Sequence, residues 1–172
     1  MCPSGADQAS PLGAANERPL KICVVFDDEA SSQSAEVLIR HVASDYQRDT
    51  QSFRFDELDP PGPSIAAARS ACDTDILVLA VGEDRILPSH VKLWLGLCVA
   101  LRDEDQDGAL VVLISNGVET TNLDSPLLEY LEAVAAIGGL TFFPRTLAPR
   151  FAAGSGLPTT QTRIRKTLNR TY

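Results

Sequence analysis

The chain has 172 residues, a length that suits one domain with a single hydrophobic core. Hydrophobic residues make up 44% and charged residues 22%, as in an ordinary globular domain, and no apolar run reaches the length of about 18 residues needed to span a membrane. The formal net charge of −8 disfavours general nucleic-acid binding. Residues 1–19 lack the apolar stretch of a signal peptide, so they are interpreted as a disordered leader and the protein as cytoplasmic.

The negative charge is unevenly distributed along the chain. Residues 145–172 contain no acid and six basic side chains: Arg145, Arg150, Arg163, Arg165, Lys166 and Arg170. Removing those six charges from the net −8 leaves −14 on the rest of the chain. The basic tail either folds back on its own acidic body or binds an anionic partner, and the first is expected because the intramolecular partner is always present.

The first half of the chain predicts strands that alternate with helices. Residues 20–26 form an apolar, β-branched run, which indicates a buried parallel strand. The serines that follow predict the start of a helix, whose apolar residues recur at helical spacing up to Tyr46. A weaker strand is expected over 51–58, and a proline-rich break separates it from an alanine-rich helix over 64–72.

The second half continues the same alternation. Residues 75–81 and 109–114 are apolar on both faces, which predicts two central strands. Helices are expected over 88–102 and from Ser125 to the Gly138-Gly139 pair. A short fifth strand follows over 140–143, and the tail is predicted to hold a short helix over 160–169.

Strands alternating with helices imply right-handed crossovers and an α/β domain of three layers, with a doubly wound, five-stranded parallel sheet. The predicted strand order is 2-1-3-4-5, within a domain over 20–145 that precedes the basic tail over 146–172. Ligands of such sheets lie beyond the carboxyl ends of the strands, at the switch point between strands 1 and 3. Function is therefore expected in three loops, over 27–34, 82–89 and 115–124.

The first of these loops combines serines with acids. Ser31, Ser32 and Ser34 could hold a phosphate group at a helix N-terminus, although the neighbouring acidic side chains would repel it. In the alternative interpretation the serines cap the helix and the acids complement its dipole. Asp27 and Asp28 also offer the hard oxygen ligands that Mg²⁺ accepts, which makes them weak candidates for a metal site.

The helix over 88–102 is apolar nearly all round. One face must meet the sheet, and an exposed apolar patch on the other would mark an interface. A homodimer through this helix is the hypothesis, with Trp94, Leu97 and Leu101 at its interface. In the alternative, the basic tail covers the patch.

Four cysteines, at positions 2, 23, 72 and 98, form no CxxC motif. They are predicted to be free, buried thiols of a reducing compartment. His41 and His90 have no partners at ligand spacing, so a zinc site is not expected.

Residues 87–95 read LPSHVKLWL and resemble a stretch of the flavodoxin-like NAD(P)H-dependent FMN and quinone reductases that follows their third strand. The resemblance implies that Ser31, Ser32 and Ser34 hold the FMN phosphate. It also implies that the backbone after strands 3 and 4 flanks the isoalloxazine, at Gly82, Pro88, Ser115, Asn116 and Gly117. The chain departs from that family at its acidic first loop and at Gly96, where an aspartate is usual.

A second resemblance is to the receiver domains of response regulators. The acidic pair Asp27-Asp28 follows strand 1, and Ser115 fits the small hydroxyl after strand 4. Ala80 stands at the position of the phosphoacceptor aspartate, and Pro144-Arg145 stand where a lysine is expected. The resemblance therefore implies a pseudo-receiver that is not phosphorylated on aspartate.

Both resemblances imply the flavodoxin-like fold. The degenerate loops favour a non-catalytic binding or regulatory module that needs no cofactor and acts through contacts with an unidentified protein partner. The alternative is an FMN-dependent NAD(P)H:quinone or flavin oxidoreductase.

Overall fold

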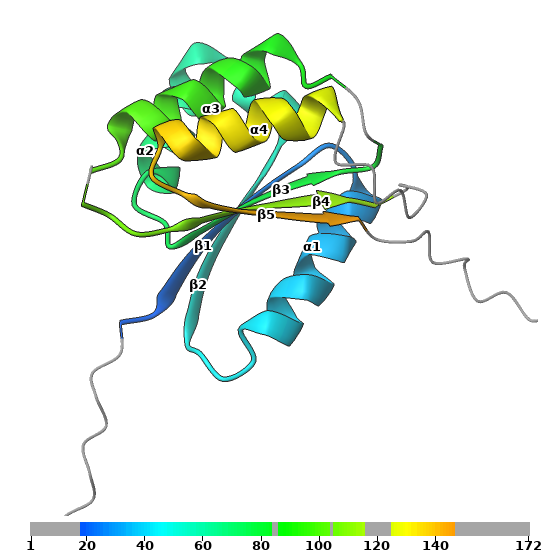
Figure 1. Cartoon of the computed structure of the whole chain (residues 1–172), viewed down its shortest axis with the longest axis vertical. Helices are drawn as coiled ribbons and strands as arrows, with labels where there is room; N and C mark the ends of the chain where they lie inside the picture. Colours follow the sequence, from blue (N-terminus) through cyan, green and yellow to red (C-terminus); the bar gives the residue numbers. More distant parts are fainter. Residues whose placement is uncertain (1–17, 84–85, 104, 116–124, 147–172) are drawn as a thin grey trace, which may run out of the picture.

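The structure, a computed structural model, describes residues 18–83, 86–103, 105–115 and 125–146 (Figure 1). Residues 1–17 of the predicted leader over 1–19, and the predicted helix over 160–169, lie outside the described residues, and both stay predictions. Arg18, near the end of the predicted leader, pairs with Asp75 at 2.6 Å.

Within the described residues, five parallel strands form one sheet in the order β2-β1-β3-β4-β5. Their bounds are Leu20–Phe26 for β1, Arg48–Arg54 for β2, Ile76–Val81 for β3, Ala109–Ile114 for β4 and Thr141–Thr146 for β5. This order is that of the flavodoxin-like doubly wound sheet, with its switch point between β1 and β3. The predicted fold class and strand order are confirmed.

Four helices of the described chain cover the two faces of the sheet. They are α1 over Glu29–Val42, α2 over Pro61–Ala71, α3 over Ser89–Leu101 and α4 over Pro126–Ile137. Figure 1 shows α2, α3 and α4 together on one face, with α3 in the middle, and α1 on the other face. The core is correspondingly divided into two apolar clusters, one on each side of the sheet.

The bounds of β2 and β5 differ from the prediction, and β2 begins at Arg48, three residues before its predicted start. β2 ends at Arg54, and Phe55–Leu58 form a short 3₁₀ helix, because the Glu57 carboxylate accepts the Arg54 N–H at 2.6 Å and turns the chain. Phe55 and Leu58 are buried by this turn, which explains why an alternating apolar pattern suggested a longer strand.

The fifth strand, in contrast, continues past its predicted end and runs through Pro144 to Thr146. The Thr141 N–H donates to the Gly108 carbonyl at 2.9 Å. The backbone groups of successive residues in a strand point alternately to either side. The backbone groups of Phe143 and Arg145 therefore also face β4, and those of Pro144 face outward. Its missing N–H therefore costs no hydrogen bond within the sheet.

Arg102, directly after α3, ties three segments together at the amino ends of the strands. Its Nη1 donates to the carbonyls of Cys72 at 3.1 Å and Thr74 at 3.0 Å, between α2 and β3. Its Nη2 donates to the carbonyls of Gln106 at 3.4 Å and Asp107 at 3.3 Å, in the turn before β4. One guanidinium thus satisfies backbone carbonyls that no strand or helix pairs.

Candidate functional site

The switch point between β1 and β3 is the place where this fold binds ligands, and the connection from β1 to α1 is very short there. Only Asp27 and Asp28 lie between the end of β1 and the first residue of α1. Asp28 is the N-cap, and its carboxylate accepts the Ser31 N–H at 2.8 Å. The prediction that the serines begin and cap the helix is wrong, because Asp28, three residues before Ser31, is an equally good cap.

Asp27 joins the ends of the two strands at the switch point. Its N–H donates to the Ala80 carbonyl at 3.2 Å, which extends the pairing of β1 with β3. Its two carboxylate oxygens accept the Gly82 N–H at 2.9 and 3.1 Å. An anion that belongs to the chain itself therefore holds a backbone donor at the ligand edge of the sheet.

The three serines assigned to a phosphate have different surroundings. Ser31 is fully buried on the side of α1 that faces the sheet, in line with Ala35 and Ile39. The Ser34 hydroxyl donates to the Ala30 carbonyl at 2.8 Å within the helix, and Ser32 is half-buried. In this arrangement Ser31 and Ser34 serve the packing and the backbone of α1 and do not present a common anion-binding surface.

Ser115 extends β4 by one residue, since its N–H donates to the Val81 carbonyl at 2.8 Å. Strand alternation places its side chain on the same face as Val111 and Leu113, which pack in the cluster beneath α1. The hydroxyls of Ser31 and Ser115 are both buried and have no hydrogen-bond partner in the described structure. The carboxyl edge thus holds two unpaired hydroxyls on the α1 side of the sheet.

The remaining predicted ligand residues are only partly described. Gly82 is buried and its N–H is taken by Asp27, whereas Pro88 is exposed just before α3. Asn116 and Gly117 lie outside the described residues. The bond between Asp27 and Gly82 is the feature that sequence reasoning missed, although an acid at the end of β1 and a glycine after β3 were visible signals.

Asp27 and Asp28 are also the predicted candidates for a Mg²⁺ site. The described part of the chain contains no group of three or more side chains that could hold a metal ion. Asp27 and Asp28 instead accept backbone N–H groups of Gly82 and Ser31. The structure therefore gives the predicted magnesium site no support.

The apolar character of α3 has an explanation within one chain. The helix packs on the sheet and lies between α2 and α4, which leaves only its outer strip exposed (Figure 1). Trp94 is fully buried, so its assignment to a dimer interface is wrong: it belongs to the core of the chain itself. Leu97 is half-buried and Leu101 is 45% exposed, and a homodimer through this helix stays a prediction.

Cys23 and Cys98 are buried free thiols, as predicted. Burial raises the pKa of Cys23 to about 12 and also raises the pKa of Cys98. Cys72 is only half-buried, and its thiol donates to the Arg69 carbonyl at 3.1 Å.

Iodoacetamide at pH 8 should modify Cys72 in the folded protein and leave Cys23 and Cys98 intact. The thiolate is the reacting species, and a pKa near 12 leaves about one thiol in 10⁴ ionised at that pH. Peptide mapping by mass spectrometry checks this, with protein in 8 M urea (about enough to unfold most domains) as the control in which all three react. Modification of Cys23 under native conditions would contradict the buried environment.

No protein-family model matches the chain, and no curated protein matches it in sequence. Among solved structures it is similar to a flavodoxin from Streptococcus pneumoniae TIGR4, with 11% identity and a TM-score of 0.49 over 75% of this chain and 83% of that one. It is also similar to the Trp repressor binding protein from Bacillus subtilis, with 14% identity and a TM-score of 0.47 over 73% and 82%. A third similar structure is general stress protein 14 from Treponema denticola in complex with FMN. It has 14% identity and a TM-score of 0.47 over 76% of this chain and 85% of that one. The fold assignment rests on the strand order and not on these likenesses.

None of the described helices is both long and apolar enough to cross a membrane.

Proposed function

We propose that the chain is a non-catalytic binding module that uses a flavodoxin-like sheet and acts through contacts with another protein. One observation favours this proposal over an enzyme that binds a phosphate-bearing cofactor: the Asp27 carboxylate accepts the Gly82 N–H at the switch point. A ligand phosphate at this edge would lie near the Asp27 carboxylate, which already accepts the hydrogen bond of the Gly82 N–H. Two unit charges about 4 Å apart repel by about 4 kcal/mol at the effective dielectric constant of a protein surface.

The N-terminus of α1 supports the same proposal. A helix N-terminus attracts anions through its free N–H groups and its dipole. Here the Ser31 N–H is bonded to the Asp28 carboxylate, and Glu29 adds a second negative charge in the first turn. Acidic side chains of the chain itself thus already accept hydrogen bonds from the Gly82 and Ser31 N–H groups, which would otherwise be available to a phosphate.

An FMN-dependent oxidoreductase is the second candidate. It is favoured by the buried, unpaired hydroxyls of Ser31 and Ser115 at the carboxyl edge, because buried polar groups without partners are rare unless they have a role. In this alternative the flavin supplies the redox chemistry, and the protein supplies position and electrostatics.

A titration of FMN fluorescence separates the two candidates. We expect no quenching with tens of micromolar of the purified chain, because the carboxylates repel the phosphate. Quenching with a micromolar Kd would instead favour the oxidoreductase. In that case Ser115→Ala should weaken FMN binding. The control is Ser44→Ala, which changes an exposed serine beyond α1 and should leave FMN binding unchanged.

A further inference from the structure

The face of the sheet beneath α1 is unevenly covered. The register places Val24, Val78, Val111 and Phe143 in one row across β1, β3, β4 and β5. Val24 and Val78 are buried, Val111 is half-buried, and Phe143 is 44% exposed. Burial therefore decreases from the strands under α1 towards β5.

A neighbouring row shows the same gradient. Ala80 and Leu113 are fully buried, but Arg145, their partner on β5, is exposed. On the opposite face α4 covers β4 and β5, so that Leu110 and Val112 are fully buried. Parallel sheets are normally covered on both faces. The α1 face of β5 and of part of β4 lacks such a cover among the described residues.

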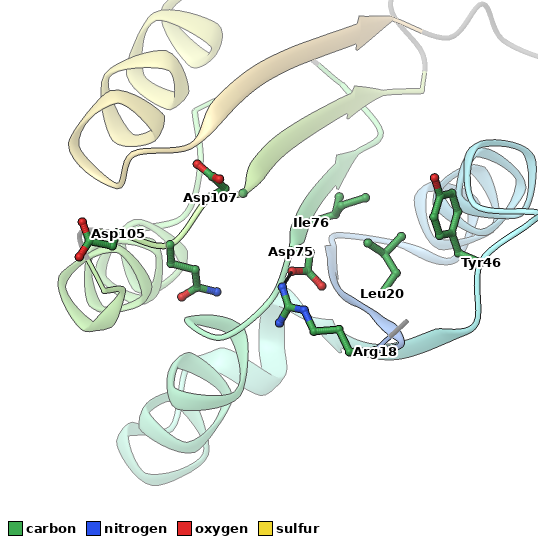
Figure 2. Close-up of a pocket in the computed structure, with 9 residues that line it drawn as sticks. Arg18, Leu20, Tyr46, Asp75, Ile76, Asp105 and Asp107 are labelled. Carbon is green, nitrogen blue, oxygen red and sulfur yellow. Dashed lines mark hydrogen bonds and ion pairs between the residues drawn. The ribbon is translucent and has the colours of Figure 1, made fainter. Parts of the chain in front are cut away.

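An open groove of about 700 Å³ lies on the same face, at the amino ends of the strands. Its apolar wall comes from Leu20, Ile76 and Tyr46. Figure 2 shows these three side chains on one side of the groove and Asp105 and Asp107 on the other side. Arg18 points to Asp75 and pairs with it, so the acids of the Asp105–Asp107 turn form the negative rim.

Residues 147–172 suit this uncovered face in position, length and charge. They start directly after Thr146, at the end of β5, which is the least buried of the four strands in these rows. The six residues of β4 span about 20 Å, a distance that about 13 helical residues cover, so the segment is long enough to return along the sheet. The segment has five basic residues and no acid, and it also contains apolar side chains such as Phe151, Ile164 and Leu168.

We propose that residues 147–172 return over the α1 face of β4 and β5 and lie beside α1. Their apolar side chains cover Val111 and Phe143, and their basic side chains face Asp105 and Asp107. The tail is a better occupant than a second copy, because its attachment to β5 gives it an effective concentration in the millimolar range. This inference is independent of the proposed function.

Photo-cross-linking in the full-length chain tests the proposal. Benzoylphenylalanine replaces Phe143, and a matched variant carries it at Ile137, which is 79% exposed at the end of α4. A mixture of ¹⁴N- and ¹⁵N-labelled protein distinguishes links within one chain from links between copies. We expect position 143 to link to residues 147–172 of the same chain, at several times the yield found from position 137. Links between copies, links to residues 1–17, or the absence of links to the tail would overturn the proposal.

A second set of variants tests the charge complementarity. Asp105→Lys combined with Asp107→Lys, in the chain with the cross-linker at position 143, should lower the yield of links to the tail at least threefold. Glu129→Lys combined with Glu132→Lys makes the same change in net charge on the exposed surface of α4 and should leave the yield unchanged. An equal yield from both charge variants would overturn the role of the acidic rim.

Discussion

Replacing Trp94 by alanine should lower the free energy of unfolding by about 4 kcal/mol, the usual cost of removing a large aromatic side chain from a core. Trp94 is fully buried in the larger apolar cluster, where α3 meets the sheet between α2 and α4. Urea denaturation followed by circular dichroism measures this loss of stability. The slope of the unfolding free energy against urea concentration should stay unchanged if the native state stays compact.

Two further variants separate this core role from a role in association. Leu93→Ala changes an α3 side chain that is 67% exposed and should cost less than about 0.5 kcal/mol. Trp94→Phe keeps an aromatic ring and removes an indole N–H that is buried without a hydrogen-bond partner, so it should cost only about 1 kcal/mol. Equal losses for Trp94→Ala and Leu93→Ala would contradict the assignment of Trp94 to the core.

Arg102→Ala should destabilise the protein by about 2 kcal/mol, because it leaves the carbonyls of Cys72 and Thr74 without their donor. The guanidinium fits beside position 108 because that residue is a glycine, where a Cβ atom would overlap the Arg102 side chain. Arg102→Lys should recover only part of the loss, because an ammonium cannot reproduce the planar fork of donors. Thermal or urea unfolding measures both variants.

Arg40→Ala is the matched control for this prediction. Arg40 is exposed on α1 and lies 4.0 Å from Glu36, an ion pair of the kind that contributes little to stability. A loss below about 0.5 kcal/mol is expected. If Arg102→Ala proved as mild as Arg40→Ala, the four carbonyls would have to find water as an equally good partner.

The parallel sheet could be predicted from the sequence because its central strands have a strong signal. Residues 20–26, 75–81 and 109–114 are apolar on both faces, a pattern typical of strands buried between two layers of helices. The end of α4 was equally clear, and Gly139, with a φ of +62°, lies where the helix stops.

Other features depend on contacts that no local pattern contains. An apolar helix surface indicates burial but does not tell whether a partner molecule or a neighbouring helix provides it, and for α3 the neighbours are α2 and α4. The start of α1 was misplaced because serine and aspartate are equally good caps, and the choice between them depends on where β1 ends.

The location of the candidate site at the carboxyl edge of the sheet stays a prediction, and two of its contacts could not be predicted from the sequence. The confirmed strand order puts the described residues that follow β1 and β3, Asp27 and Gly82, at the same edge of the sheet. The bond from Gly82 to Asp27 joins residues far apart in the sequence, and the burial of Ser31 follows from the earlier start of α1. Neither can be derived from residue types alone.

The outward position of Pro144 also affects how the protein meets other molecules. Edge strands are templates for further strands, and an added strand would pair with the outward backbone groups of β5. Pro144 removes a donor from the middle of that row. At the opposite edge β2 is exposed over most of its length and begins with Arg48 and Asp49, charges that also discourage strand addition. Extension of the sheet by a strand of another molecule is therefore disfavoured at both edges, and so is aggregation by edge-to-edge pairing.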